Sequence, residues 1–570
     1  MEEREEHARK YALKNAVDYG KAIPGPIVSK LMAESKGQLD AREAAKIAKA
    51  AAAWANALSK EDLQKEYSQY SQEFEAEKKV KAEKTAKPKM ELEGAEAGSF
   101  VTRFPPEPSG YMHLGHAKVA ILEQEFKNIY KGKLLLYWDD SNPEKERKEF
   151  VDAFKKDLDW LGIKFDREVY ASDNIEKVYE YAKKMISDGK AYACSCDSEQ
   201  MKEGRMKGKG CEHRLASPED SLKVFGQMLK GELQEGDAVI RFKGDMKSEN
   251  TTLRDPTLMR IKKDKHYRQG GKYNVWPLYD LNTPINDFLN GVTDVIRDKN
   301  YGLRDALYLA IVDALGIRRP RIHPEARLVV NNNITSKRTL NILVEEGKIS
   351  GYDDPRLITL VALKRRGVRP AAIKEFVMRF GMSKSESHVD LSMLMDENKK
   401  IVDPEAKRLY FVENPAKLTV EGASKQAVEL KLHPTAGMGS RTIHVGNTFY
   451  ISAADSKELQ MGATVKLKGL YGVRITRFDK DSAIGTQSEE DSKLKFQWVV
   501  DGNRMPCEII VPKPPLKDDG EFDADSIKVV KGFVEDYASK LKEGEVVQFE
   551  RFGFCILDNR KTMSFIFMSK

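Results

Sequence analysis

The chain has 570 residues, 32% of them charged, and its 96 Lys and Arg against 89 Asp and Glu leave a formal net charge of +7. This composition excludes a membrane-spanning protein, because no run approaches the roughly eighteen apolar residues that a membrane helix needs, and five cysteines in this length exclude a disulfide framework. The length predicts about four domains. With an acidic N-terminus unlike a signal peptide, we expect a cytoplasmic enzyme with no membrane partner.

The first part of the chain is predicted to be helical. Residues 1–78 contain two helix starts that resemble capping boxes, at 40–43 and 59–62. Between them, an alanine-rich run places four apolar side chains on one helix face: Ile47, Ala51, Trp54 and Leu58. Residues 79–98 are rich in Lys, Glu and Ala without apolar periodicity, and we interpret them as a linker.

The next segment has the pattern of a nucleotide-binding turn. Its sequence Pro106-Glu-Pro-Ser-Gly-Tyr-Met-His-Leu-Gly-His116 follows a strand-like run and precedes a helical run over 117–130. Gly110 and Gly115 allow the backbone to approach a ligand closely. His113 and His116 lie where a helix N-terminus offers free N–H groups to anions. The alternative is a proline-rich loop that caps an ordinary helix.

Strands and helices alternate over residues 99–193 and again over 276–335, which predicts an α/β domain interrupted by an insertion. A buried strand is expected at 133–138. It is followed by the two carboxylates Asp139 and Asp140. The carboxyl end of a parallel strand is where such sheets place ligand contacts, although a solvated acidic turn is the alternative.

The insertion, residues 194–275, begins with a cluster of metal-ligand types. Three cysteines and a histidine lie in two short segments: Cys194, Cys196, Cys211 and His213. Three thiolates and an imidazole are typical of a closed tetrahedral Zn²⁺ site, which leaves no position for water and is therefore structural. The alternative is three buried thiols beside a surface histidine. Cys507 and Cys555 are isolated and expected to fill cores.

Downstream, Asn333-Ile-Thr-Ser-Lys-Arg338 precedes a mainly helical stretch over 336–397. A lysine in such a loop can act as a mobile point charge on phosphates, although Ser-Lys-Arg is also common on basic surfaces. Residues 398–570 alternate apolar and polar side chains over short runs. This pattern predicts an all-β region, which we expect to form barrels.

The two loops together resemble the HIGH and KMSKR signatures of class I aminoacyl-tRNA synthetases. In the second loop Ile334 and Thr335 replace the usual Lys-Met and remove one positive charge. The resemblance implies catalytic roles for His113, His116 and Lys337, and Mg²⁺ bound with ATP. It implies ATP contacts from Pro106, Glu107, Pro108, Ser109, Gly110, Tyr111, Met112, His113, Leu114, Gly115, His116, Ser336, Lys337 and Arg338.

Residues 137–146, Tyr-Trp-Asp-Asp-Ser-Asn-Pro-Glu-Lys-Glu, are similar to the RFDDTNPEKE segment of glutamyl- and glutaminyl-tRNA synthetases. Glutaminyl enzymes have a small uncharged residue where this chain has Arg297, which favours glutamate because a second cation suits its second carboxylate. Which arginine meets which carboxylate stays open. The resemblance implies a glutamate pocket formed by Arg103, Asp139, Tyr279, Thr283 and Arg297.

The whole chain resembles the archaeal type of glutamyl-tRNA synthetase. This implies ATP-dependent ligation of L-glutamate to tRNA(Glu) through a glutamyl-adenylate by a monomer, with charging of tRNA(Gln) left open.

The rival hypotheses are a glutaminyl-tRNA synthetase, a nucleotidyltransferase of other substrates, and a catalytically weak tRNA-binding scaffold. The implied domains are a helical appendage (1–78), a linker (79–98), a Rossmann-like catalytic domain (99–193 and 276–335), a zinc-bearing acceptor-binding insertion (194–275), a helical connective domain (336–397) and anticodon-binding β-barrels (398–570).

Overall fold

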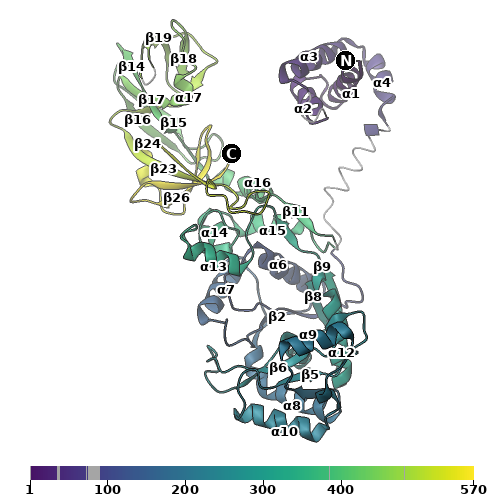
Figure 1. The fold of residues 1–570 in the computed structure, drawn as a ribbon. Helices are drawn as coiled ribbons and strands as arrows, with labels where there is room; N and C mark the ends of the chain where they lie inside the picture. The colour runs from purple at the N-terminus through teal and green to yellow at the C-terminus, as the bar shows by residue number, and fades with distance from the viewer. Residues whose placement is uncertain (1, 35–38, 72, 75–89, 384, 480–481) are drawn as a thin grey trace. The chain divides into compact units, whose positions relative to one another are not determined.

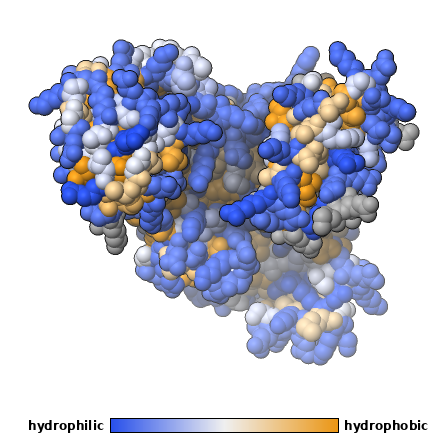
Figure 2. All heavy atoms as spheres, turned by 90° about the horizontal axis from the view of Figure 1, so that it is seen from above, coloured by the Kyte–Doolittle hydropathy of each residue, from blue (hydrophilic) through white to orange (hydrophobic). Residues whose placement is uncertain are grey.

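The structure is a computed structural model that describes residues 2–34, 39–71, 73–74, 90–383, 385–479 and 482–570. The chain divides into two compact units, Met1–Lys87 and Pro88–Lys570 (Figure 1). Within the described ranges, no helix has both the length and the apolar character needed to cross a membrane. The face shown in Figure 2 is mainly hydrophilic, with apolar side chains in small separate groups.

The first unit is helical, as predicted. Its described helices are α1 (Glu2–Tyr19), α2 (Pro24–Glu34), α3 (Ala41–Ala57) and α4 (Lys60–Ser68). Helix α3 packs on α1 and α2 through small side chains, namely Ala44, Ala48, Ala51, Ala52 and Ala55.

The predicted apolar face of α3 is therefore displaced, because Ile47 and Trp54 are only half-buried at its edge. Alanines allow the helix backbones to approach more closely than larger side chains would. Ser59 caps α4 as expected, but Asp40 makes no side-chain cap bond. Of the predicted linker, residues 79–89 lie outside the described residues.

Two parallel sheets form the centre of the second unit, one in the order β3-β2-β1 and the other formed by β8 and β9. Thr293, just before β8, donates its backbone N–H to the carbonyl of Val101 at 2.9 Å and so joins the two halves. The parallel pairing of strands that are connected through helices confirms the predicted α/β character. The strands are β1 (Val101–Phe104), β2 (Lys133–Trp138), β3 (Arg167–Tyr170), β8 (Asp294–Asp298) and β9 (Arg321–Glu325).

The helices connected to these strands are α6 (Leu114–Ile129), α7 (Lys148–Trp160) and α12 (Gly302–Leu315), with the short turns η1 (Ala171–Asn174) and η4 (Lys299–Tyr301). Helix α6 packs on β1 and β2. It begins at Leu114, before the predicted start at 117, because His113 already serves as its N-cap. The signature turn, residues 106–116, thus ends in the first turn of a helix that is buried along one face.

The insertion is built on an antiparallel sheet in the order β4-β5-β6-β7. The sheet extends a few residues past the predicted limits 194 and 275, because strand membership depends on pairing partners that sequence periodicity does not reveal. Its elements are β4 (Ala191–Cys194), β5 (Val239–Phe242), β6 (Thr257–Ile261), β7 (Val275–Pro277), α8 (Ile175–Ser187), α9 (Ser198–Lys207), α10 (Pro218–Lys230), α11 (Tyr279–Leu289), η2 (Glu212–Leu215) and η3 (Thr251–Leu253).

The following region is helical apart from a short parallel pair, β10 with β11, that the sequence did not predict. Helix α15 of this region packs on α6 and joins it to the catalytic core. The elements are β10 (Leu328–Val330), α13 (Lys337–Glu345), α14 (Leu360–Arg365), α15 (Pro370–Met378), β11 (Ser387–Val389), α16 (Leu391–Val402) and η5 (Asp403–Glu405).

The C-terminal region is β-rich, as predicted, and contains two seven-stranded sheets and a hairpin, β15–β16. One sheet comprises β12 (Lys407–Leu409), β25 (Val546–Phe549), β26 (Gly553–Asn559), β27 (Ser564–Ser569), β23 (Arg504–Pro512), β24 (Ile527–Glu535) and β13 (Phe411–Glu413). The other sheet and the hairpin comprise β21 (Lys495–Phe496), β18 (Thr464–Leu467), β19 (Gly472–Phe478), β20 (Ser482–Ser488), β14 (Pro415–Glu421), β17 (Thr448–Ser452), β22 (Val499–Val500), β15 (Gln426–Lys431) and β16 (Ser440–Val445).

The two edge strands of each sheet are neighbours in the chain. Tyr410 alone separates β12 from β13, and two residues separate β21 from β22. Cys507 and Cys555 are both buried in the core of the first sheet, which confirms their expected packing role. The short helices α17 (Ala453–Ser456) and η6 (Asp536–Lys540) complete the region.

Candidate active site

The signature turn connects the carboxyl end of β1 to the first turn of α6. The backbone N–H of Leu114 donates to the carbonyl of Ile358 at 3.0 Å, and that of Leu360 donates to the carbonyl of Met112 at 2.8 Å. These bonds tie the turn to a segment more than 200 residues downstream. Gly115 has no room for a side chain, because a Cβ there would lie 2.8 Å from the His113 ring.

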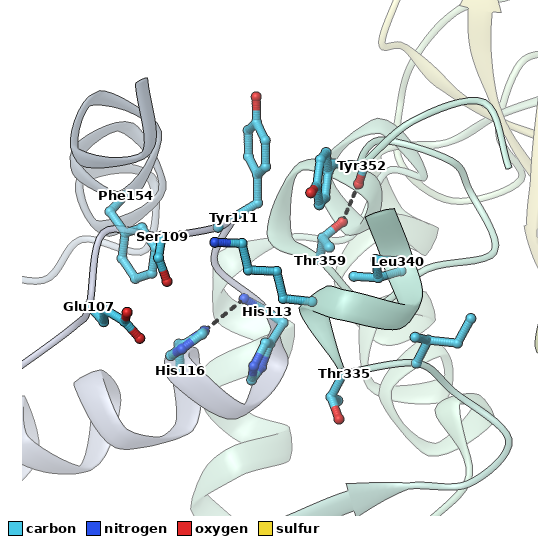
Figure 3. Close-up of a pocket in the computed structure, with 13 residues that line it drawn as sticks. Glu107, Ser109, Tyr111, His113, His116, Phe154, Thr335, Leu340, Tyr352 and Thr359 are labelled. Atoms are coloured by element: carbon cyan, nitrogen blue, oxygen red, sulfur yellow. Dashed lines mark hydrogen bonds between the residues drawn. The ribbon is translucent and has the colours of Figure 1, made fainter. Parts of the chain in front are cut away.

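The two signature histidines are neutral hydrogen-bond donors. Nδ1 of His113 accepts the backbone N–H of Gly115 at 3.0 Å. Nδ1 of His116 accepts the backbone N–H of His113 at 3.2 Å (Figure 3). Burial lowers the pKa of both rings, that of His113 to about 4. A neutral ring with an accepting Nδ1 carries its proton on Nε2. Each histidine therefore has one N–H left to offer a ligand.

Lys337 faces the same turn from the first position of α13. Its stem lies along Gly110, where an added Cβ would be 3.3 Å from Cδ of the lysine. Burial lowers the pKa of Lys337. The lysine and both histidines line a cavity of about 240 Å³ together with Glu107 and Thr335, which brings the two predicted signature loops together (Figure 3).

Not every predicted ATP contact faces a cavity. Met112 and Leu114 are fully buried in the core, Pro108 uses its carbonyl to accept the backbone N–H of Arg147 at 3.1 Å, and Arg338 is exposed. Ile334, where the family has a lysine, is buried in a small apolar cluster with Leu340, Leu343, Ile349 and Leu357. The departure from the signature thus serves packing of the loop.

A larger cavity of about 1150 Å³ adjoins the first and shares Glu107, His113, His116 and Thr335 with it. It lies over the carboxyl ends of β1, β2 and β8, the edge where such sheets bind ligands. Four of the five predicted glutamate contacts line it, and so do Pro106, Gly115 and Ser336: the four are Arg103, Asp139, Tyr279 and Arg297. Thr283 does not line this cavity, because its side chain is buried in α11. The Thr283 hydroxyl has no hydrogen-bond partner there.

Both arginines are already paired with acids. Nε of Arg103 donates to Asp287 Oδ1 at 2.9 Å, with both side chains about 2% exposed. Burial alone would lower the pKa of Arg103, but the charge of Asp287 raises it overall. Arg297 is paired with Asp305 through Nη2, while its buried Nε has no partner. Arg297 thus keeps a free N–H.

Asp139 follows β2 and is held by its neighbours. Its backbone N–H donates to the carbonyl of Pro106 at 3.1 Å, and Oδ1 accepts Nδ2 of Asn282 at 3.0 Å. Burial, followed by the charge of Glu107, raises the pKa of Asp139 to about 6. The carboxylate is therefore ionised at neutral pH and can meet an ammonium group.

The sequence analysis missed three supporting residues: Asp287, Asp305 and Asn282. The asparagine could have been found, because Asn282, Asn286 and Asn290 recur at four-residue spacing along α11. The side-chain amides of the later two each donate to the backbone carbonyl of the asparagine four residues earlier. The two acids carry no such signal, since each lies on a helix and the arginine that it pairs with lies on a strand.

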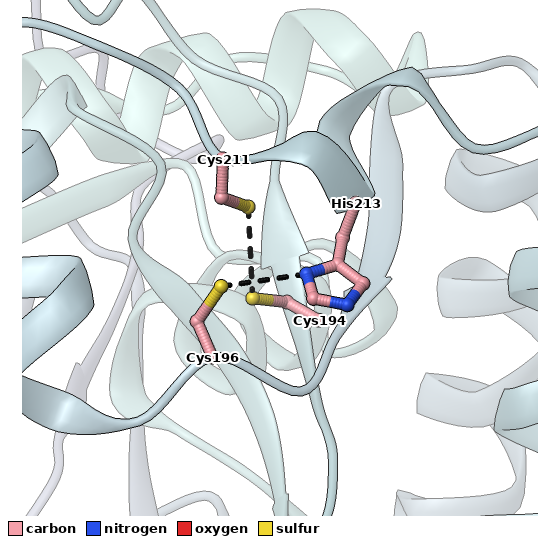
Figure 4. Close-up of side chains that lie close together, drawn as sticks. All are labelled: Cys194, Cys196, Cys211 and His213. Carbon is pink, nitrogen blue, oxygen red and sulfur yellow. Dashed lines mark hydrogen bonds between the residues drawn. The ribbon is translucent and has the colours of Figure 1, made fainter.

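The predicted metal ligands come together at the end of β4 and the start of η2 (Figure 4). Sγ of Cys194 and Cys211 are 3.8 Å apart, and Sγ of Cys196 is 3.4 Å from Nδ1 of His213. Tetrahedral zinc with Zn–S bonds of about 2.3 Å sets these separations at about 3.8 and 3.5 Å. Nε2 of His213 bonds the Ser195 hydroxyl at 2.8 Å, so Nδ1 is left for a metal. The donor set fits Zn²⁺.

Three family models match this chain. Residues 99–404 match tRNA synthetases class I (E and Q), catalytic domain, and residues 406–494 and 495–558 match two anti-codon binding domain models of the same group.

The chain is also similar over nearly its full length to curated archaeal proteins named glutamate–tRNA ligase. It is 39% identical to that of Nitrosopumilus maritimus, covering 99% of both chains. It is 38% identical to that of Cenarchaeum symbiosum, covering 96% of both, and 38% identical to that of Pyrococcus abyssi, covering 97% of this chain and 96% of the other. The chain therefore belongs to the class I tRNA synthetases of the E and Q group.

Proposed function

We propose that this chain ligates L-glutamate to tRNA(Glu) with ATP, through a glutamyl-adenylate. The observation that carries the proposal is that Arg297 lines the larger cavity together with Arg103, Asp139 and Tyr279. A glutamine side chain carries no charge and would give up a charge-assisted hydrogen bond to these arginines, which costs about 1–3 kcal/mol or more. The relatives support glutamate over glutamine, since each is named glutamate–tRNA ligase.

In the first step the glutamate α-carboxylate attacks the α-phosphorus of ATP and diphosphate leaves. No protein base is needed, because the nucleophile is already ionised, so the residues contribute position and charge. We assign Asp139 to the substrate ammonium, Arg297 and Arg103 to its carboxylates, the Nε2–H groups of His113 and His116 to phosphate oxygens, and Lys337 to the diphosphate. Mg²⁺, when bound with ATP, neutralises phosphate charge.

In the second step the 2′-hydroxyl of the terminal tRNA adenosine attacks the carbonyl carbon of the adenylate, and AMP leaves. We assign acceptor-end binding to the insertion built on β4–β7. We assign anticodon binding to the two C-terminal sheets, which we propose to be barrels because each is bridged by a nearly continuous edge strand.

Pyrophosphate exchange and charging assays test the function. Exchange that requires both glutamate and tRNA supports the proposal. Exchange with glutamine would indicate a glutaminyl enzyme, and exchange that needs neither tRNA nor an amino acid would indicate another nucleotidyltransferase. A chain with no exchange activity would be a tRNA-binding scaffold.

We further propose that tRNA(Gln) is charged as well. Charging of tRNA(Glu) that exceeds that of tRNA(Gln) by more than about 10³-fold in kcat/KM would contradict this.

We also propose that Cys194, Cys196, Cys211 and His213 hold one structural Zn²⁺. The separations of their ligand atoms support this. Elemental analysis should find about one zinc per chain, and Cys211→Ser should lose it and lower the unfolding temperature of the insertion. Protein without zinc whose thiols are freely alkylated would contradict the proposal.

A further inference from the structure

The ammonium of Lys337 has an uncharged partner. Its Nζ lies 5.2 Å from the centroid of the Phe150 ring, within the range of a cation–π contact. Glu107, the acid with the largest effect on the pKa of Lys337, forms no ion pair or hydrogen bond with it. Glu149, adjacent to Phe150 on α7, is instead occupied by the Tyr111 hydroxyl, which donates to it at 2.6 Å.

Phe150 is fixed in place by a stack of aromatic rings. The Tyr111 ring meets Phe150 edge to face, with centroids 5.6 Å apart and planes at 81°. On its other side Tyr111 packs against Tyr352 at 4.6 Å, and the Tyr352 hydroxyl is hydrogen-bonded to Asn341 of α13. Tyr111 belongs to the signature turn and Tyr352 follows α13 in the chain. Figure 3 shows both side chains. The stack therefore joins α7, the turn and the helix that carries Lys337.

A carboxylate in the place of Phe150 would hold the lysine but would also neutralise it and compete with incoming phosphate. The quadrupole of a benzene ring attracts the ammonium without supplying a counter-charge. The lysine can then approach the signature histidines with its full charge. A partner of this kind suits a cation that must be positioned before ATP binds and still be available to it.

We propose that Phe150 is a positioning residue for Lys337, whose ring face holds the ammonium beside the signature turn before ATP arrives. This inference rests on the proposed function, in which Lys337 stabilises the departing diphosphate. The ring itself touches no reacting atom. It acts by limiting the positions that the lysine side chain occupies, so its loss should reduce kcat and leave the glutamate KM unchanged.

The test replaces Phe150 by leucine, by tyrosine and by mono-, di- and trifluorinated phenylalanine, and measures glutamate- and tRNA-dependent pyrophosphate exchange. Phe150→Leu should lower kcat by about tenfold, and Phe150→Tyr should restore most of it. Stepwise fluorination keeps the shape of the ring and withdraws its π charge. The logarithm of kcat should therefore fall in proportion to the number of fluorines.

The same leucine substitution in a Lys337→Ala background supplies the control. If Phe150 acts through the lysine, the leucine substitution should not lower kcat any further in the Lys337→Ala background. The inference would be overturned, and Phe150 would be a packing residue, if kcat did not change along the fluorination series or if leucine lowered kcat equally in both backgrounds. The fluorinated variants decide this even if Phe150→Leu folds poorly. A wild-type chain with no glutamate-dependent exchange would instead overturn the proposed function, and this inference with it.

Discussion

The two ends of the active-site cavity use charge in opposite ways. At the phosphate end the donors are two neutral histidines and Lys337, which faces an aromatic ring. At the amino-acid end Arg103 and Arg297 are each paired with an aspartate. ATP brings several negative charges and departs as diphosphate, so unpaired donors suit it. Glutamate differs from glutamine by one charge, and fixed, paired cations suit that discrimination.

The largest expected effect is on stability, at the amino-acid end, and it tests whether the charge of Arg103 supports the fold or binds substrate. Arg103→Met should destabilise the fold by about 3–5 kcal/mol, because it leaves Asp287 buried without its cation. Chemical unfolding measures this, and Arg319→Met, which breaks the exposed pair with Asp313, should cost less than about 1 kcal/mol. If Arg103→Met were as stable as wild type and lost only glutamate affinity, Arg103 would be a substrate ligand with no structural role.

At the phosphate end, removal of the unpaired cation should affect rate and not stability. Lys337→Ala should lower kcat for pyrophosphate exchange by roughly 10²–10³ with little change in tRNA affinity, because the contact forms with charge that develops in the transition state. Lys348→Ala, just beyond the same helix, is the matched control. Near-full activity of Lys337→Ala would remove the contrast between the two ends.

A smaller effect should come from the arginine that keeps a free N–H. Arg297→Met should lower kcat/KM for glutamate by roughly 10–100-fold, because a charged hydrogen bond to the substrate carboxylate is lost. The preference for glutamate over glutamine should fall in parallel. Competition assays with both amino acids check this. An unchanged ratio would mean that selectivity is determined elsewhere in the cavity.

The smallest effect is a pH dependence confined to one end. The pKa of Asp139 is raised to about 6, so the carboxylate loses its charge as the pH falls through that value. The KM for glutamate should therefore rise below pH 6, approaching tenfold per pH unit. The Asp139→Asn variant should bind glutamate weakly, with a KM that does not change with pH. His113, with its pKa lowered to about 4, stays neutral over pH 5–8. A wild-type KM that is flat over this range would contradict the ionic role of Asp139.

Local patterns were predictable where a few adjacent residues determine the outcome. The strand at 133–138 formed with the predicted limits, and the spacing of three cysteines and a histidine brought their ligand atoms within 4.8 Å of one another. The burial of alanines in α3 and the position of Thr283 were not predicted. Those outcomes depend on how closely another helix approaches and on which way a helix faces.

The sequence by itself determined the chemistry available: a glycine-rich turn with two histidines, a lysine loop, carboxylates and arginines at strand ends, and a metal-ligand cluster. Only the tertiary structure decided how these charges are used. Whether an arginine is free or paired depends on Asp287 and Asp305, and the ring beside Lys337 comes from a helix nearly 190 residues earlier in the chain. Coulomb and cation–π attraction act over a few ångströms of space, so they depend on neighbours that only folding brings together.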